Sequence, residues 1–167
     1  MARAAYVASA LLYVGVVLWA WSTFPERVPV HWGGGGDVDR VVSKGRALAE
    51  LVVIGGVMSL LLGGAAVLVR RLPLAWINVP HKEFWTRPEN RPVLHRRLAT
   101  DLWLVATATL LLLTVLVVQV GLVADDPDPR LGPLFWVTFG VYLLLMVGYA
   151  VHSAVRRYRP GRPEGDA

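Results

Sequence analysis

The chain of 167 residues contains no cysteine, and only 17% of its residues are charged. The missing cysteines exclude disulfides and thiolate metal ligands. Common catalytic signatures are missing as well: the sequence shows no phosphate-binding GxxxxGK[ST] loop, no HExxH zinc motif and no Ser-His-Asp arrangement. We therefore expect a protein without enzymatic activity and without a cofactor.

Apolar residues are abundant and lie in long blocks. They make up 55% of the chain, above the roughly 45–50% of a typical soluble domain. Four runs, 5–22, 47–69, 102–123 and 133–154, reach roughly 27–35 Å as helices at about 1.5 Å per residue, which suits a hydrocarbon core of about 30 Å. The first run could instead be a cleaved signal peptide, but it exceeds the usual 7–15 apolar residues and ends in W-A-W-S-T-F-P, so we favour a retained helix.

These runs predict an all-α integral membrane protein, a bundle of four transmembrane helices over residues 1–155 with a basic, polar tail over 156–167. Of its 17 Lys and Arg residues, five lie in segments 24–46 and 124–132, and the other twelve lie at the termini and in the middle loop. The positive-inside rule then places both termini and the middle loop in the cytoplasm and segment 24–46 outside, in a cell membrane. The same rule explains the net charge of +5, so we expect no nucleic-acid partner.

The segment 24–46, FPERVPVHWGGGGDVDRVVSKGR, is polar and rich in glycine. Its two prolines favour an extended backbone, and Gly33–Gly36 permits a turn with positive φ. His31, Asp37 and Asp39 could together hold a divalent cation, although one histidine and two carboxylates at this spacing match no metal motif. We favour a structural role, in which His31 packs onto the helix ends and the aspartates pair with nearby basic residues. An imidazole also changes charge near physiological pH, so His31 could instead sense pH.

Two further features concern packing and buried charge. Gly55, Ser59 and Gly63 recur every four residues in the second run, a spacing that lets membrane helices approach closely, and Gly56 and Gly64 form a neighbouring row. Glu50 and Asp101 lie close to predicted helix starts, where carboxylates cap helices at the interface.

The order of residues in segment 24–46 resembles the signature of a known family. F-P-E-R-V-P-V-H-W, followed by glycines and D-V-D-R-V-V-S-K-G, is similar to a bacterial membrane domain of unknown function that forms the N-terminal half of the SdpI family of toxin-immunity and signal-transduction proteins. The family usually has Leu where this chain has Phe24. I-N-V-P-H-K-E-F-W, residues 77–85, is similar to a second family segment, in which His81 replaces the usual Asn.

The resemblance implies a non-enzymatic membrane protein that recognises an extracellular peptide or toxin and signals to a cytoplasmic regulator. On the outer side it points to Pro29, His31, Trp32, Gly34 and Lys44 as ligand-binding residues. On the inner side it points to Asn78, Pro80, Lys82 and Trp85 as partner-binding residues.

Other functions remain open at the level of sequence. The middle loop interleaves Trp76, Phe84 and Trp85 with basic residues, which suits anionic lipid headgroups as well as a protein partner. A small transporter, or an accessory subunit of one, would need polar residues at the membrane midplane, where Ser59, Thr107, Thr114 and Tyr142 lie. An outward-facing metal-binding protein is a third candidate, and the chain could form homo-oligomers.

Overall fold

The computed structural model describes residues 1–160. Within them, four helices are long and apolar enough to cross a membrane, which indicates a membrane protein. The first is α1 (Ala2–Thr23), and the second is the continuous run of α2 (Lys44–Met58), the π-helical η1 (Ser59–Gly63), α3 (Gly64–Leu68) and the 3-10 helix η2 (Val69–Arg71). The third is α5 (Arg91–Val123), and the fourth is α6 (Pro133–His152), which continues into the π-helical η4 (Ser153–Arg157).

The predicted apolar runs fall inside these helices, and the largest difference concerns α5. This helix begins at Arg91 rather than at residue 102. Pro92 is compatible with this start, because it lies in the first turn, where a missing backbone donor costs nothing. Its 33 residues span about 50 Å, well over the roughly 30 Å of a hydrocarbon core. One end of α5 must therefore extend beyond the bilayer. Of the predicted tail 156–167, residues 161–167 lie outside the described part of the chain.

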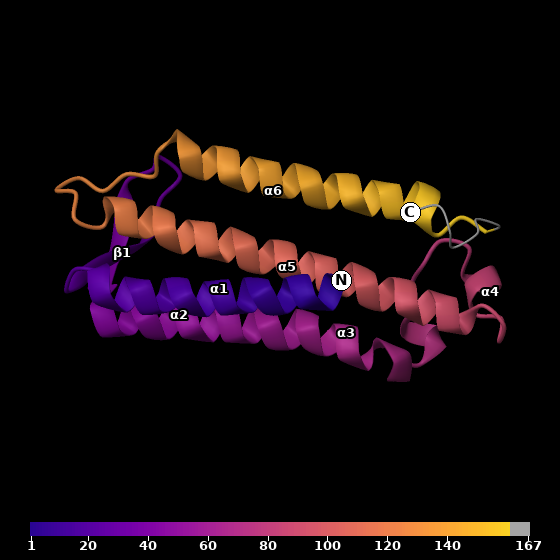
Figure 1. Cartoon of the computed structure of the whole chain (residues 1–167). Helices are drawn as coiled ribbons and strands as arrows, with labels where there is room; N and C mark the ends of the chain where they lie inside the picture. Colours follow the sequence, from indigo (N-terminus) through magenta and orange to yellow (C-terminus); the bar gives the residue numbers. More distant parts are fainter. Residues whose placement is uncertain (161–167) are drawn as a thin grey trace.

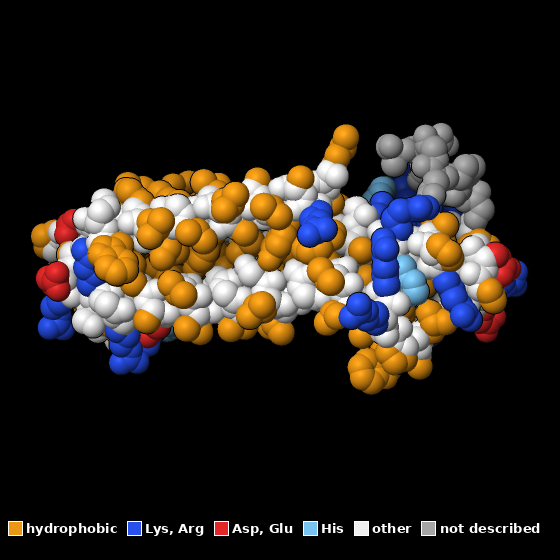
Figure 2. Space-filling view, turned by 60° about the horizontal axis from the view of Figure 1, so that its bottom comes forward, with side chains coloured by type: hydrophobic (Ala, Val, Ile, Leu, Met, Phe, Trp, Pro, Cys, Tyr) orange, Lys and Arg blue, Asp and Glu red, His pale blue; other side chains and the backbone are white. Residues whose placement is uncertain are grey.

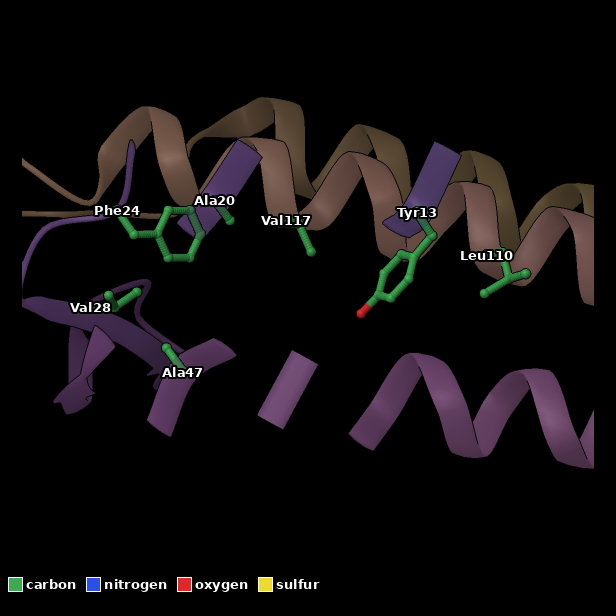
Figure 3. Close-up of a cluster of buried hydrophobic side chains, with 7 residues drawn as sticks. All are labelled: Tyr13, Ala20, Phe24, Val28, Ala47, Leu110 and Val117. Carbon is green, nitrogen blue, oxygen red and sulfur yellow. The ribbon is translucent and has the colours of Figure 1, made fainter. Parts of the chain in front are cut away.

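The helices run side by side along one long axis (Figure 1). α1 packs along α5 and also contacts α2, so these three form the main bundle. Their shared core includes Tyr13 and Ala20 of α1 and Leu110 and Val117 of α5 (Figure 3). α6 packs along α5, and over its described length, 133–152, it has no buried residue.

Two glycines of the second helix lie where α1 packs most closely. A Cβ atom on Gly55 would lie 2.1 Å from Cε1 of Tyr13, and one on Gly63 would lie 2.7 Å from the hydroxyl of Tyr6. The predicted packing face is therefore real at these two positions. The neighbouring row is not part of it, because a Cβ atom on Gly56 or Gly64 would meet no described atom within 4 Å.

Between α1 and α2 the chain forms a β-hairpin, which the all-helical prediction missed. β1 (Arg27–Trp32) pairs antiparallel with β2 (Val38–Ser43), and the register shifts after Pro29 and after His31. Valines supply the strand-forming residues, and the glycines supply the predicted turn, in which Gly36 has a φ of +82°. Val28 is fully buried in the main core, so the hairpin is anchored on the bundle rather than free.

Candidate functional sites at the two ends of the bundle

The first candidate site is the hairpin end, which comprises β1, β2 and the connection 124–132 between α5 and α6 (Figure 1). On the hairpin, Nδ1 of His31 lies 2.6 Å from Oδ1 of Asp39, and both side chains are more than half exposed. The aspartate thus orients the imidazole at the surface. The expected pairing of Asp39 with a basic residue is wrong, because its partner is this histidine.

The hairpin is tied to the 124–132 connection by two polar contacts. The indole Nε1 of Trp32 donates a hydrogen bond to the carbonyl of Pro129 at 3.0 Å, and Arg130 lies 3.0 Å from Oδ1 of Asp37. Arg130 also donates to Asp128 at 2.9 Å, and this hydrogen bond, with the two nearby carboxylates, raises the pKa of the guanidinium. Two segments that are far apart in the sequence therefore form one polar cap.

The structure does not gather the predicted ligand-binding residues at one point. His31 and Trp32 lie at the distal part of β1, and Gly34 lies in the exposed turn beyond them. Pro29 is buried against the bundle, and Lys44 is the first residue of α2, with its backbone N–H bonded to the carbonyl of Glu26. The distal hairpin is thus one candidate surface, whereas Pro29 and Lys44 support its base.

A cluster of charges lies where the hairpin meets α2. Glu50 accepts two hydrogen bonds from Arg40 of β2, at 3.2 and 2.8 Å, and one from Nε of Arg46 at 3.1 Å. The paired fork geometry with Arg40 is the strong form of this contact. Glu50 therefore joins the hairpin to the helix rather than only capping the helix start.

The second candidate site is the basic end, which we define as residues 70–101 and 153–160, at the opposite end of the bundle. It contains the 3-10 helices η2 and η3 (Leu74–Trp76), the short helix α4 (Lys82–Trp85), the first turns of α5 and the end of the fourth helix. Blue Lys and Arg side chains gather over this end, and a mostly apolar surface separates them from the hairpin end (Figure 2). Its sequence carries most of the positive charge of the chain.

Trp85 is the centre of this end. It is buried, its Nε1 donates a hydrogen bond of 2.8 Å to the carbonyl of Tyr158, and its ring packs edge-on against the ring of Tyr158. The guanidinium of Arg97 lies 4.9 Å from the ring centroid, a cation–π contact. Arg97 also donates to the carbonyl of Arg157. Trp85 thus joins three segments: α4, α5 and the end of the fourth helix.

Asp101 completes this junction. Its carboxylate accepts hydrogen bonds from the hydroxyl of Tyr149 at 2.7 Å and from that of Tyr158 at 2.6 Å. Nε of Arg157 lies 2.7 Å from Oδ1, but its N–H does not point at an acceptor, so this contact is an ion pair rather than an aligned hydrogen bond. Burial, and then the hydrogen bond to Asp101, raise the pKa of the Tyr158 phenol, which stays protonated as a donor.

The prediction that Asp101 caps a helix start is wrong, because it lies ten positions into α5. Sequence reasoning also missed Arg97, Arg157 and the two tyrosines that surround it. The available signal was the ionisable side chain itself, since a carboxylate beside a membrane span is a candidate for a special role. The π-helical turn η4 supports this view, as such turns are frequent at functional sites.

The other predicted partner-binding residues lie around Trp85 with different exposure. Asn78 is exposed, Pro80 is partly buried, and Nζ of Lys82 donates to the carbonyl of Ala75 at 3.0 Å. His81 has a left-handed backbone with a φ of +56°. The family resemblance predicts Asn at this position. Asn tolerates a left-handed backbone better than most residues, so the backbone conformation explains that preference.

The residues named for metal binding and for transport lie in different surroundings. Within residues 1–160, no group of three or more His, Cys, Asp or Glu side chains could hold a metal ion. Thr107 and Thr114 donate to carbonyls of their own helix, at Trp103 and Leu110, whereas the hydroxyl of Tyr142 on α6 shares a hydrogen bond of 3.0 Å with Thr109 of α5.

Comparison with known proteins adds one match. Residues 8–55, which cover most of α1, the hairpin and the first part of α2, match the model of a domain of unknown function (DUF1648). No curated protein and no solved structure matches the chain. A domain of unknown function is thus shown over the segment that carries the first signature, and the link to the SdpI family stays a prediction.

Proposed function

We propose that this protein is a non-enzymatic membrane sensor, which binds an extracellular peptide at the distal hairpin and passes the signal to a cytoplasmic partner at the basic end. One observation carries the proposal: the single helix α5 contacts both candidate sites. Val117 of α5 belongs to the same buried cluster as Val28 of β1, and Arg97 and Asp101 of the same helix hold the Trp85 junction.

The distribution of charge supports an orientation with the hairpin outside. The positive-inside rule places the basic end in the cytoplasm of a bacterial cell membrane, together with both termini. The distal hairpin then faces the exterior, with the exposed pair of His31 and Asp39 and the Trp32 ring available to a peptide.

Rigid contacts offer a path between the two sites. Displacing Trp32 from Pro129 would remove one of the two polar contacts that hold the 124–132 connection, which leads directly into both α5 and α6. At the other end of the same two helices, Asp101 of α5 and Tyr149 of α6 are hydrogen-bonded. A change in how α6 lies along α5 would therefore reach Trp85 and Tyr158, where a partner could detect it.

The orientation is tested first, by labelling of introduced cysteines. The sequence has no native cysteine that would add background labelling. Gly34→Cys in the hairpin turn and Glu89→Cys at the basic end are both exposed positions. In intact cells, a membrane-impermeant maleimide should label the first variant and not the second, and cell lysis should expose the second. The reverse pattern would overturn the orientation and with it the proposed direction of signalling.

The sensing role is tested by survival of bacteria challenged with a membrane-active peptide toxin of the kind that the SdpI family counters. Cells that express the protein should keep their membrane potential, and Trp32→Ala or His31→Ala should abolish this protection at equal protein levels. Trp136→Ala, an exposed tryptophan on α6, serves as the matched control. Protection that all variants retain would remove the hairpin from the site, and no protection by the wild type would reject a role against that toxin.

A further inference from the structure

A pocket of about 100 Å³ lies beneath the hairpin, between β1, α2 and α5. Figure 3 shows part of its lining: Phe24 and Val117 on one side, and Val28 and Ala47 on the other. The lining among the described residues is apolar except for Glu50. Such a pocket suits an apolar group, and its volume is of the order of engineered cavities that hold one small hydrocarbon.

One residue of the pocket lining also lies on the outer surface of the bundle. Ile54 lines it and is nevertheless 46% exposed, on the apolar surface of a helix that is long enough to span a membrane. In a bilayer, that surface faces lipid. Lipid is therefore the nearest source of an apolar ligand for this pocket.

A cluster of charged side chains lies beside the pocket. Glu50, one turn before Ile54, is bound by the guanidinium groups of Arg40 and Arg46, so two positive charges face one negative charge. The side chain of Arg46 is 65% exposed. An apolar pocket beside a net positive cluster, at the end of a spanning helix, complements a molecule with an acidic headgroup and an apolar tail.

We propose that this pocket is a binding site for an anionic phospholipid, which places a few methylene groups of one acyl chain between β1, α2 and α5 while its phosphate lies against Arg46. The site goes beyond the proposed sensing of a peptide, since it lies at the base of the hairpin rather than at its distal part. In a bilayer the surrounding tails are as apolar as the pocket, so insertion of the chain gives little selectivity by itself. The headgroup contact with the arginines then decides which lipid binds.

The experiment uses the full chain in detergent micelles, with lipid binding followed by native mass spectrometry. Phosphatidylglycerol and phosphatidylcholine of identical chain length are compared, and glycerol phosphate serves as the headgroup without a tail. Wild-type protein should bind phosphatidylglycerol at least five-fold more tightly than phosphatidylcholine, and glycerol phosphate should bind much more weakly than either lipid.

Variants separate the two halves of the site. Val120→Phe fills the pocket and should weaken both lipids at least five-fold, whereas Arg46→Gln should remove the preference for phosphatidylglycerol. Val137→Phe, an exposed position on α6, is the matched control and should change neither. If Val120→Phe does not fold, Ile54→Phe enlarges the exposed part of the lining instead.

Three results would overturn the proposal: equal affinity for the two lipids, unchanged binding in the pocket-filled protein, or binding of glycerol phosphate as tight as that of the lipid. Lipid binding is measured on purified protein, whereas the peptide-sensing role is measured by cell survival. Failure of one assay is therefore distinguishable from failure of the other.

Discussion

Replacing Gly55 by alanine tests how closely α1 and α2 pack. The added Cβ atom would lie 2.1 Å from Cε1 and 2.7 Å from Cζ of Tyr13, whereas carbon atoms in good contact lie about 3.5–4.0 Å apart. The tyrosine cannot easily give way, because it is only 6% exposed and its hydroxyl donates a hydrogen bond of 2.7 Å to the carbonyl of Leu51.

The expected loss of stability follows from these two contacts. Overpacking a well-filled core costs about 1–3 kcal/mol, and losing the hydrogen bond adds about 0.5–1.5 kcal/mol. We therefore expect Gly55→Ala to lower the free energy of unfolding by about 1.5–4.5 kcal/mol. Reversible unfolding in mixed micelles of mild detergent and dodecyl sulfate, followed by circular dichroism, measures this quantity.

The control lies one residue along the same helix. Gly56→Ala meets open space, so it should leave stability unchanged or raise it by up to about 1 kcal/mol through helix propensity. A second control removes the ring: in a Tyr13→Ala background, Gly55→Ala should cost almost nothing. Equal stability of the two alanine variants, or the same cost with and without the tyrosine, would refute this account of the packing.

Three further predictions concern the basic end. Asp101→Asn leaves the charge of Arg157 without its partner, and both side chains are largely buried. We therefore expect the free energy of unfolding to fall by about 1–3 kcal/mol, measured by the same unfolding assay. Burial, and then the hydrogen bond to Asp101, raise the pKa of Tyr158 above its ordinary value of 10.0, so the contribution of the neutral phenol to stability is complete below that pH and is lost as the pH rises above it. The advantage of wild type over Tyr158→Phe should therefore shrink above about pH 10, and a constant difference would contradict this. His81→Val should cost about 1–2 kcal/mol because of its left-handed backbone, whereas His81→Asn should be neutral; equal melting temperatures for both would argue against strain at this position.

The helices could be predicted from the sequence because a membrane span needs only length and low polarity, and both are visible in a linear pattern. The start of α5 lies outside the apolar run, because residues 91–101 mix basic residues with a few apolar ones. Leu94, Val93 and Leu98 pack in the cluster of Trp85 and Tyr158. The hairpin was missed for a related reason. Its prolines and glycines indicated an extended segment and a turn, but pairing of the two strands depends on anchoring of Val28 in a core formed by other segments.

The candidate sites also depend on contacts between distant segments, which the sequence alone does not reveal. The pattern of segment 24–46 indicated an extended segment with a turn. It did not reveal that Pro29 faces the bundle, or that Trp32 reaches a carbonyl 97 residues away in the 124–132 connection. At the basic end, Trp85 was identified and Asp101 was assigned to a cap. Its role depends on Tyr149, Arg157 and Tyr158, which follow it by 48 to 57 residues, and separations of that size carry no local signal.

The packing of α1 against α5 has a consequence for how the protein is made. α1 leaves the ribosome before its main partner α5, which begins only at Arg91. At roughly 5–20 residues per second, α5 follows about 5–20 s later. During that interval α1 and the second helix must lie in the bilayer as a pair. The core that buries Val28 of the hairpin then lacks Leu110 and Val117 of α5. α6, which packs along α5, joins after it. The assembly of the bundle therefore waits on its third helix, and a chain interrupted before residue 91 would leave the first helix inserted but without its principal contact.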